Sequence, residues 1–213
     1  MTALPHPRTA DLFESPVPPG TGWPGDPASP DTPVAKNAED VARIAAHCGK
    51  FEDLDAAISV CRACPRLVTW REDTAVTKRA QWRDEPYWGR PAPSFGDPSA
   101  RMAIIGLAPA AHGANRTGRM FTGDQSGDWL YRALNDAGIA SQAQSIDAAD
   151  GLTLHDCRII APVHCAPPDN WPSPDEKRTC AIWFDHELAR LITMRAVMRS
   201  EEHTSELQSL IHL

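Results

Sequence analysis

Short apolar runs separated by glycine- and proline-rich segments mark the middle of the chain. Residues 102–105 (MAII) end at Gly106, and residues 158–163 (RIIAPV) lead into a second loop. Such runs are typical of strands buried on both faces of a parallel sheet. Apolar residues with helical spacing follow each loop, beginning after Ser126 and after Ser173, where the serines can cap the helices. The repeated order of strand, loop and helix predicts an α/β fold.

Two loops follow these predicted strands, at residues 106–127 and 164–173. Ligands in α/β sheets bind beyond the carboxyl ends of the strands, so we expect the functional site between these loops. Earlier in the chain, helical spacing begins at Val41 and a second short helix is predicted after Asp53. Residues 71–100 are rich in Trp, Pro and Gly and are interpreted as a long loop, which in a domain is often functional.

The two ends of the chain lack this periodicity. The first 33 residues hold 9 of the 20 prolines, so we predict that residues 1–37 form a disordered leader. From Arg199 the sequence RSEEHTSELQS resembles the translation of a sequencing adapter, and residues 199–213 are interpreted as a non-native tail, with a genuine polar tail as the alternative. The expected domain therefore spans residues 38–198 and is expected to be incomplete at its C-terminus.

The formal net charge of −7 belongs mainly to the two ends, and residues 61–199 are close to neutral. Local arginine clusters, such as Arg62, Arg66 and Arg71, permit a surface that faces nucleic acid without requiring one. The sequence shows neither an apolar run of membrane-spanning length nor a secretory signal. We therefore expect a cytoplasmic protein that has no membrane partner.

Four of the six cysteines lie close to the predicted loops. Cys61 and Cys64 form a CxxC motif, and Cys165 and Cys180 flank the second loop and the following helix. Four thiolates can bind zinc or an iron-sulfur cluster, and spacing alone does not separate the two. The alternatives are a thiol-redox motif at Cys61 and Cys64, or small buried hydrophobic residues at Cys165 and Cys180. Two further cysteines, at positions 48 and 157, are interpreted as buried free thiols.

Three segments, in the same order along the chain, resemble motifs of the type-5 uracil-DNA glycosylases. They are CRACPRLV at 61–68, GLAPAAHGANRTGRMFTGDQSG at 106–127 and HCAPPDNWPSPDE at 164–176. The resemblance covers about residues 55–198. It implies a three-layer α/β/α sandwich around a central four-stranded parallel sheet, here expected to lack its last strands. It also implies a 4Fe-4S cluster held by Cys61, Cys64, Cys165 and Cys180, and a monomer that removes uracil and related deaminated bases from DNA.

The same resemblance implies roles for individual residues. Phe121 matches the aromatic residue that stacks on the extruded base, Asn170 the amide that reads the base edge, and Asp124 the acid that activates water. The ordinary alternatives are a core phenylalanine, an asparagine that caps its own turn and a helix-capping aspartate. The remaining residues expected to contact the base or DNA are Gly106, Leu107, Ala108, His112, Asn115 and Arg116. The last three could equally be solvated loop residues.

The resemblance further implies a histidine, on a later loop, that donates a hydrogen bond to the departing base. No matching motif follows residue 180, so we expect this chain to be impaired as an enzyme. The alternative function is a non-catalytic, metal-cluster nucleic-acid-binding module.

Overall fold

The computed structural model describes residues 2–200, and its centre is a four-stranded sheet in the order β3-β5-β4-β6. Strands β4 (Met102–Ile105), β5 (Cys157–Ile160) and β6 (Ala196–Arg199) are parallel, with Ile105 paired to Ile160 on one side and to Arg199 on the other. The two-residue strand β3 (Phe95–Gly96) is antiparallel to β5. The three parallel strands agree with the predicted parallel sheet, and β3 adds an antiparallel edge that was not predicted.

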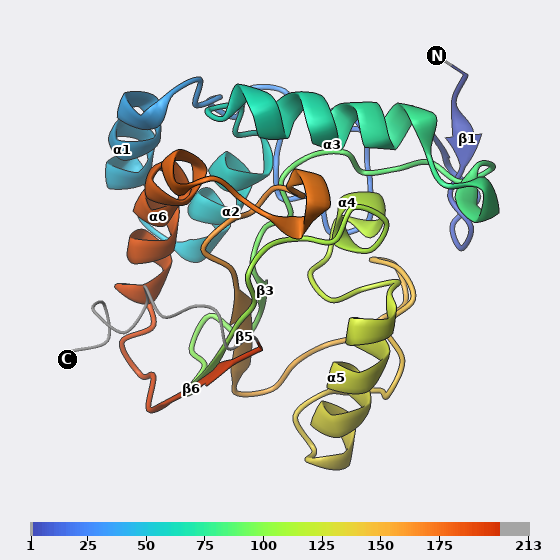
Figure 1. The fold of residues 1–213 in the computed structure, drawn as a ribbon. Helices are drawn as coiled ribbons and strands as arrows, with labels where there is room; N and C mark the ends of the chain where they lie inside the picture. The colour runs from blue at the N-terminus through green and yellow to red at the C-terminus, as the bar shows by residue number, and fades with distance from the viewer. Residues whose placement is uncertain (1, 201–213) are drawn as a thin grey trace.

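Helices cover both faces of the sheet (Figure 1). Ile104 and Ile159 pack toward α5 (Gln125–Asp136), whose Tyr131 and Leu134 belong to the same core cluster. The alternate positions, including Ile105 and Ile160, pack with residues of α6 (Pro174–Leu188) and α2 (Phe51–Ser59). Successive strand residues point to opposite faces, so the apolar residues of β4 and β5 require this cover on both sides. The predicted three-layer α/β/α arrangement is confirmed.

A third apolar cluster joins the helices that lie beyond the sheet. Helix α1 (Ala38–His47) packs on α6 and α2 through Val41 and Ile44, and Leu67 of α3 (Pro65–Thr77) joins the same cluster. Helix α3 ends at Thr77, so residues 71–77, which were predicted to belong to a long loop, are helical. The short 3-10 helix η1 (Ala80–Trp82) follows it.

The N-terminal segment is ordered against the domain, which differs from the predicted disordered leader. Strands β1 (Leu4–Pro5) and β2 (Leu12–Phe13) form a small hairpin. Phe13, Val17 and Trp23 are buried in one cluster with Trp88, and the Trp23 indole nitrogen donates to the carbonyl of Thr117 at 3.2 Å. A few long-range aromatic anchors thus give a proline-rich segment the buried area that local composition did not indicate.

The C-terminal end of the described chain also differs from the prediction. Arg199, assigned to the non-native tail, is the last residue of β6, and the backbone amide of Ser200 donates to Ile105 at 3.0 Å. The rest of the predicted tail, residues 201–213, lies outside the described residues. None of the helices among residues 2–200 has the length and apolar character needed to cross a membrane.

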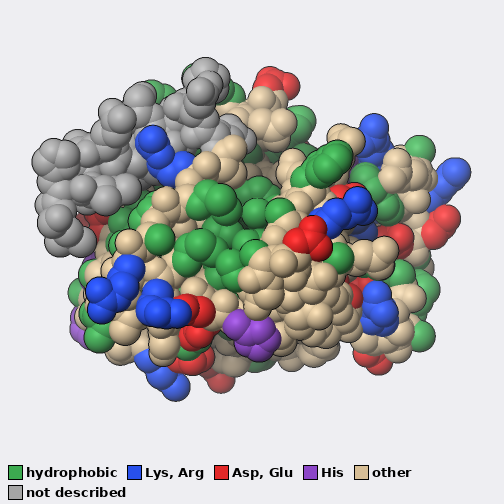
Figure 2. Space-filling model, turned by 90° about the horizontal axis from the view of Figure 1, so that it is seen from below, with side chains coloured by type: hydrophobic (Ala, Val, Ile, Leu, Met, Phe, Trp, Pro, Cys, Tyr) green, Lys and Arg blue, Asp and Glu red, His purple; other side chains and the backbone are tan. Residues whose placement is uncertain are grey.

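Charged side chains of both signs are interspersed on the molecular face seen in Figure 2, around a central group of hydrophobic side chains. This distribution agrees with the near-neutral charge of the central sequence.

Candidate active site

A cavity of about 190 Å³ lies at the carboxyl ends of the three parallel strands. Each strand contributes to it through the residues that directly follow, at positions 106, 161 and 200. The position is the one expected for a ligand in an α/β sheet. The structure thus brings together six of the predicted site residues: Gly106, Leu107, Ala108, Phe121, Asp124 and Asn170.

Phe121 forms one wall of this cavity, close above the backbone of Gly106. A Cβ atom at position 106 would lie 3.1 Å from two atoms of the Phe121 ring, so only glycine leaves the ring its full room. Phe121 itself has φ of 51°, in the left-handed region that a bulky residue rarely adopts. Its ring packs against the core beneath α5 while the residue stays partly exposed to the cavity.

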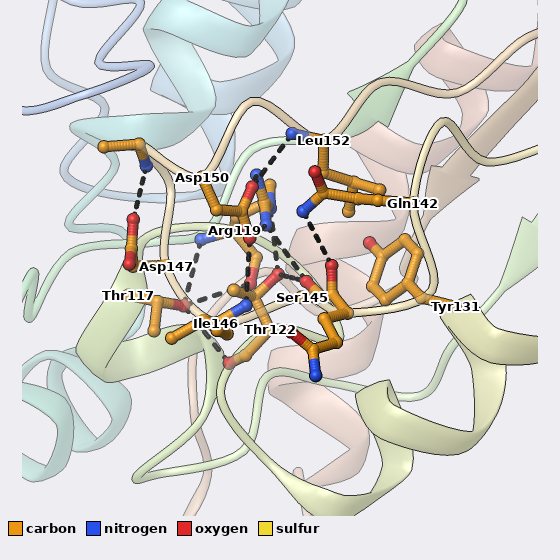
Figure 3. Close-up of polar contacts among 12 residues, drawn as sticks. Thr117, Arg119, Thr122, Tyr131, Gln142, Ser145, Ile146, Asp147, Asp150 and Leu152 are labelled. Carbon is orange, nitrogen blue, oxygen red and sulfur yellow. Dashed lines mark hydrogen bonds and ion pairs between the residues drawn. The ribbon is translucent and has the colours of Figure 1, made fainter. Parts of the chain in front are cut away.

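A buried polar network around Arg119, drawn in Figure 3, fixes the residues on both sides of Phe121. The Arg119 guanidinium donates to both carboxylate oxygens of Asp150, at 2.9 and 2.7 Å, and to the hydroxyl groups of Thr122 and Ser145. The Tyr131 hydroxyl donates to the carbonyl of Met120 at 3.0 Å. The residues on both sides of Phe121 are therefore fixed, which lets the surrounding structure offset the cost of its strained φ.

Asp124 lies at the start of α5 and also faces the cavity. Its Oδ1 accepts a hydrogen bond from the Gly127 amide at 3.0 Å, so the helix-capping interpretation holds. Its Oδ2 lies against Gly113, where any Cβ atom would collide with the carboxylate. Burial raises the pKa of Asp124 above its ordinary 3.8, although the amides of Gly127 and Ser126 act in the opposite direction.

Asn170 approaches the cavity from the loop after β5. It ends the 3-10 helix η2 (Pro168–Asn170), and both Asp169 and Asn170 have left-handed φ values, of 53° and 56°. Among residues 2–200, no residue forms a hydrogen bond with its side-chain amide. Its backbone N–H donates to the carbonyl of Pro167. The amide is thus available to a ligand and does not cap its own turn.

The three residues predicted as DNA-contact candidates have different surroundings in the structure. Asn115 is buried and donates to the carbonyl of Arg71 at 3.1 Å, so it ties the loop to α3. Arg116 is also buried, in an ion pair of 3.0 Å with Glu85 and a hydrogen bond to the Gly123 carbonyl. Both side chains hold the loop together, and the structure differs here from either predicted role. His112 lines an open cavity of about 500 Å³, and Arg116 lines a different one, next to Glu85 and Trp82.

The four predicted metal-ligating cysteines face one small cavity of about 20 Å³. Cys61 and Cys64 lie between α2 and α3, Cys165 follows β5, and Cys180 lies in α6. Cys48 packs nearby without lining this cavity, and Cys157 is buried in β5. Three segments that are distant in sequence thus converge through thiol side chains, and all six thiols are free.

The environment of these sulfur atoms combines burial with hydrogen-bond donors. Burial raises the pKa of Cys61, of Cys64 to about 12 and of Cys180, and the neighbouring Cys165 raises each of them further. The buried Arg71 donates to the Cys165 sulfur at 2.9 Å, and the His164 amide donates to the Cys180 sulfur at 3.4 Å. Such donors stabilise thiolates that bind a metal cluster.

Within the part of the chain that the structure describes, no three His, Cys, Asp or Glu side chains are grouped to hold a metal ion. In a four-iron cluster each cysteine binds a separate iron, so the sulfur atoms need not converge on one point. Four thiols around one cavity are a donor set that fits a four-iron cluster. The Nε of Arg71, buried beside this cavity without a partner, also fits an additional acceptor there.

Several residues that line the main cavity were not predicted. They are Pro109, Ala110, Met120, Ser126, Ala161 and Ser200. Most directly follow a predicted strand or adjoin a predicted site residue, so position alone could have indicated them. Ser200 could not be found in this way because it was assigned to the predicted tail, which began at residue 199.

Comparisons with known proteins agree with this geometry. A family model described as the uracil DNA glycosylase superfamily matches residues 93–198, the segment from β3 to β6. A type-5 uracil-DNA glycosylase from Mycobacterium tuberculosis is 59% identical over 182 residues, which is 85% of this chain and 68% of the relative. Another from Thermus thermophilus is 53% identical over 138 residues, 65% of this chain and 62% of that protein. The chain therefore belongs to the type-5 uracil-DNA glycosylase family.

Proposed function

We propose that this protein hydrolyses the N-glycosidic bond of uracil and related deaminated bases in DNA. The observation that carries the proposal is the convergence of Phe121, Asp124 and Asn170 on one cavity at the strand ends. A glycosylase must take the base out of the stack and hold it while the bond to the sugar breaks. An aromatic wall, a free amide and a carboxylate provide the parts that this task requires.

Each of the three residues has a distinct role in this mechanism. The Phe121 ring stacks on the extruded base. The Asn170 amide donates to and accepts from the base edge in one plane, which matches the paired polar groups of a uracil-like ring. Asp124, when ionised, stabilises the positive charge that grows on the sugar and orients the attacking water. Its raised pKa makes it a better proton acceptor than an exposed aspartate.

The departing base also needs hydrogen-bond donors for its developing negative charge. Among the described residues, no histidine lines the cavity. The Gly106 amide donates to the Ile160 carbonyl, so the backbone amides of Leu107 and Ala108 are the candidates for this role. One preorganised donor contributes about a hundredfold to a thousandfold in rate. We therefore expect the 213-residue chain to release uracil slowly. Single-turnover release at a rate equal to that of the Mycobacterium tuberculosis relative would contradict this expectation.

We also propose that Cys61, Cys64, Cys165 and Cys180 hold a 4Fe-4S cluster. The support is the set of four thiols around one cavity and the N–H donors directed at two of them. A bound cluster would supply a covalent link between the start of α3, the loop after β5 and α6. That loop carries Asn170, so the cysteines position the base-reading amide without taking part in the reaction.

Metal analysis tests the cluster directly. We expect about four iron and four sulfide per chain, with absorbance near 400 nm, and loss of both on Cys165→Ser. Cys157→Ser, which changes a cysteine outside the cavity, is the matched control. Zinc in place of iron would contradict the proposal. The thiol-redox alternative needs a thiol of low pKa, whereas burial raises the pKa of both Cys61 and Cys64.

Base release from a DNA strand with one uracil tests the catalytic proposal. We expect Asp124→Asn and Asn170→Ala each to lower the single-turnover rate by about a hundredfold, with unchanged circular dichroism. Asp136→Asn, at an exposed position near the end of α5, is the control for a charge change on the same helix. Unchanged rates in both site variants would favour the alternative, a non-catalytic nucleic-acid-binding module.

A further inference from the structure

A second, larger cavity adjoins the cavity that contains Phe121, Asp124 and Asn170, which is called the base pocket below. It has a volume of about 500 Å³ and shares Ala110, Asp124 and Asn170 with the pocket described above. Its distinctive lining comes from the segment after α3, which contributes Arg79 and Trp82, and from His112 of the loop after β4. A base that fills the base pocket would therefore place the adjacent nucleotide of the same strand at the entrance to this second cavity.

Trp82 is the centre of an aromatic and cationic group in this cavity. Its ring stacks with that of His112, with centroids 6.0 Å apart and planes inclined by 29°. The Arg116 guanidinium lies 4.4 Å from the Trp82 ring centroid, and that of Arg79 lies 5.9 Å away. Arg116 is buried and Arg79 is exposed, so one cation supports the ring from inside the protein and the other faces solvent.

The segment that carries Trp82 is held in place by contacts to the rest of the domain. Lys78 Nζ donates to the carbonyl of Glu85 at 2.6 Å, which closes the turn around η1. The Glu85 carboxylate pairs with Arg116 at 3.0 Å, and the backbone amide of Arg79 donates to the buried Tyr87 hydroxyl at 3.4 Å. The tryptophan is thus preorganised, which reduces the entropy lost when a ligand stacks on it.

The charges around the cavity restrict how a ligand can lie in it. Asp124 and Asp128 form its rim toward α5, and Arg79 lies on the side of η1. A phosphate would be repelled from the first side and attracted to the second. Burial lowers the pKa of His112, with Arg79 and Arg116 acting in the same direction, so its ring is neutral near pH 7 and suited to stacking.

We propose that this cavity binds the deoxynucleotide adjacent to the extruded base, whose base stacks on Trp82 while its phosphate contacts Arg79. Every base has an aromatic face, so stacking of this kind tolerates any neighbouring sequence. The site favours strands in which the neighbouring base is free to leave its own stack, namely single-stranded or frayed DNA. This inference rests on the proposed function because it assumes that uracil enters the adjoining pocket.

Binding of short single strands tests the site. The probe carries uracil on a 2′-fluorinated sugar, which resists cleavage, and its affinity is measured by fluorescence anisotropy. We expect Trp82→Ala to weaken binding about tenfold, since stacking of one base on an aromatic side chain contributes on that scale. On a probe whose two neighbouring bases are replaced by abasic spacers, the variant and the unmodified chain should bind equally. Trp82→Phe, which keeps an aromatic ring, should restore most of the affinity.

Arg79→Gln tests the phosphate contact separately. We expect the slope of log K against log salt to decrease by about 0.7, the value for one contact to a single strand. Trp70→Ala, which removes a half-exposed tryptophan from α3 that lines neither cavity, is the matched control and should leave affinity unchanged.

Two outcomes separate this inference from the proposed function. If the chain releases uracil and Trp82→Ala binds the intact probe as well as the unmodified chain does, the nucleotide site is wrong and the glycosylase assignment stands. If no uracil is released although binding depends on Trp82, the proposed function fails instead. Circular dichroism and melting curves establish that each variant is folded.

Discussion

Asp124 combines a structural and a chemical role in one side chain. One carboxylate oxygen caps α5 through Gly127 and the other lies at the cavity, against Gly113. Burial raises the pKa of Asp124, so its ionisation in the folded protein costs free energy at any pH above the ordinary value of 3.8. Ionised Asp124 therefore lowers the stability of the folded protein while it supplies a buried carboxylate to the cavity.

Replacing this aspartate should separate the two roles. Asparagine caps helices as well as aspartate does and carries no buried charge, so Asp124→Asn should be at least as stable as the unmodified protein at pH 7. The measurement is thermal unfolding at pH 7 and at pH 3, where the difference should vanish because both side chains are neutral. A variant that is clearly less stable at pH 7 would show that the charge itself supports the fold.

The pH dependence of base release follows from the same raised pKa. If ionised Asp124 is required, the rate should fall on the acidic side with a midpoint above 3.8. Single-turnover rates between pH 4 and pH 8 measure this limb. An acidic midpoint at or below 3.8 would contradict a role for the buried carboxylate.

At single positions, sequence reasoning succeeded where a motif fixed both the residue and its place in the fold. Asp124, Phe121 and Asn170 follow predicted strand ends, and the structure gathers them in one cavity. Asn115 and Arg116 could not be interpreted in this way. Their burial depends on partners far away in sequence, the Arg71 carbonyl and the Glu85 carboxylate, which no local pattern reveals.

The elements around the cavity are joined by polar contacts more than by regular secondary structure. Besides the core packing of Met120 and Phe121, the segment at 117–123 is held by hydrogen bonds to neighbouring loops, among them the buried Arg119–Asp150 ion pair. Burial alone would raise the pKa of Asp150. The hydrogen bonds and charge of Arg119, together with the hydrogen bonds from the Leu152 and Ile146 amides, outweigh it and lower that pKa below 3.8. The pair therefore stabilises the loop only while Asp150 is ionised.

Asp150→Asn should destabilise the protein by about 3 kcal/mol at neutral pH, because it leaves a buried guanidinium without its counter-charge. A lowered pKa in the folded state gives stability that is present above pH 3.8 and lost as the pH falls through the folded value. The deficit of the variant should therefore shrink in acid. Urea unfolding at pH 7 and at pH 3 measures this change, and Asp136→Asn should show no deficit at either pH.

Strands were predicted best where they are buried on both faces. The predicted runs at 102–105 and 158–163 are apolar apart from the buried Arg158 because helices cover both sides, and this leaves a clear signal in the sequence. Strand β6, at Ala196–Arg199, has exposed residues at three of its four positions and adjoins an atypical segment. Its identity depends on pairing with β4, which the local sequence does not encode.

At the scale of the whole molecule, the N-terminal segment forms part of the domain. Trp23 is 4% exposed, packs beside Trp88 and donates to Thr117 in the short helix α4 (Ala114–Thr117) of the active-site loop. Arg90 and Asp26 add a buried ion pair of 2.5 Å between the segment and the domain. The N-terminal segment thus supports the loop that carries Phe121 and Asp124.

Trp23→Ala should lower the melting temperature by about 10 °C, since removing a buried tryptophan costs about 3–5 kcal/mol. Trp129→Ala, at a tryptophan that is 70% exposed on α5, should change it little. Equal melting temperatures for the two variants would mean that the segment is not anchored as described.

The burial of this proline-rich segment affects how the protein should be shortened for experiments. A stretch of low complexity at the start of a chain is usually the first to be trimmed when a protein is prepared for crystals or assays. Cutting at residue 38 would here expose the indole of Trp88 and remove the partner of a carbonyl two residues before Arg119. Low activity of such a shortened protein would reflect the lost support of the loop at 106–127 and not the chemistry of the cavity.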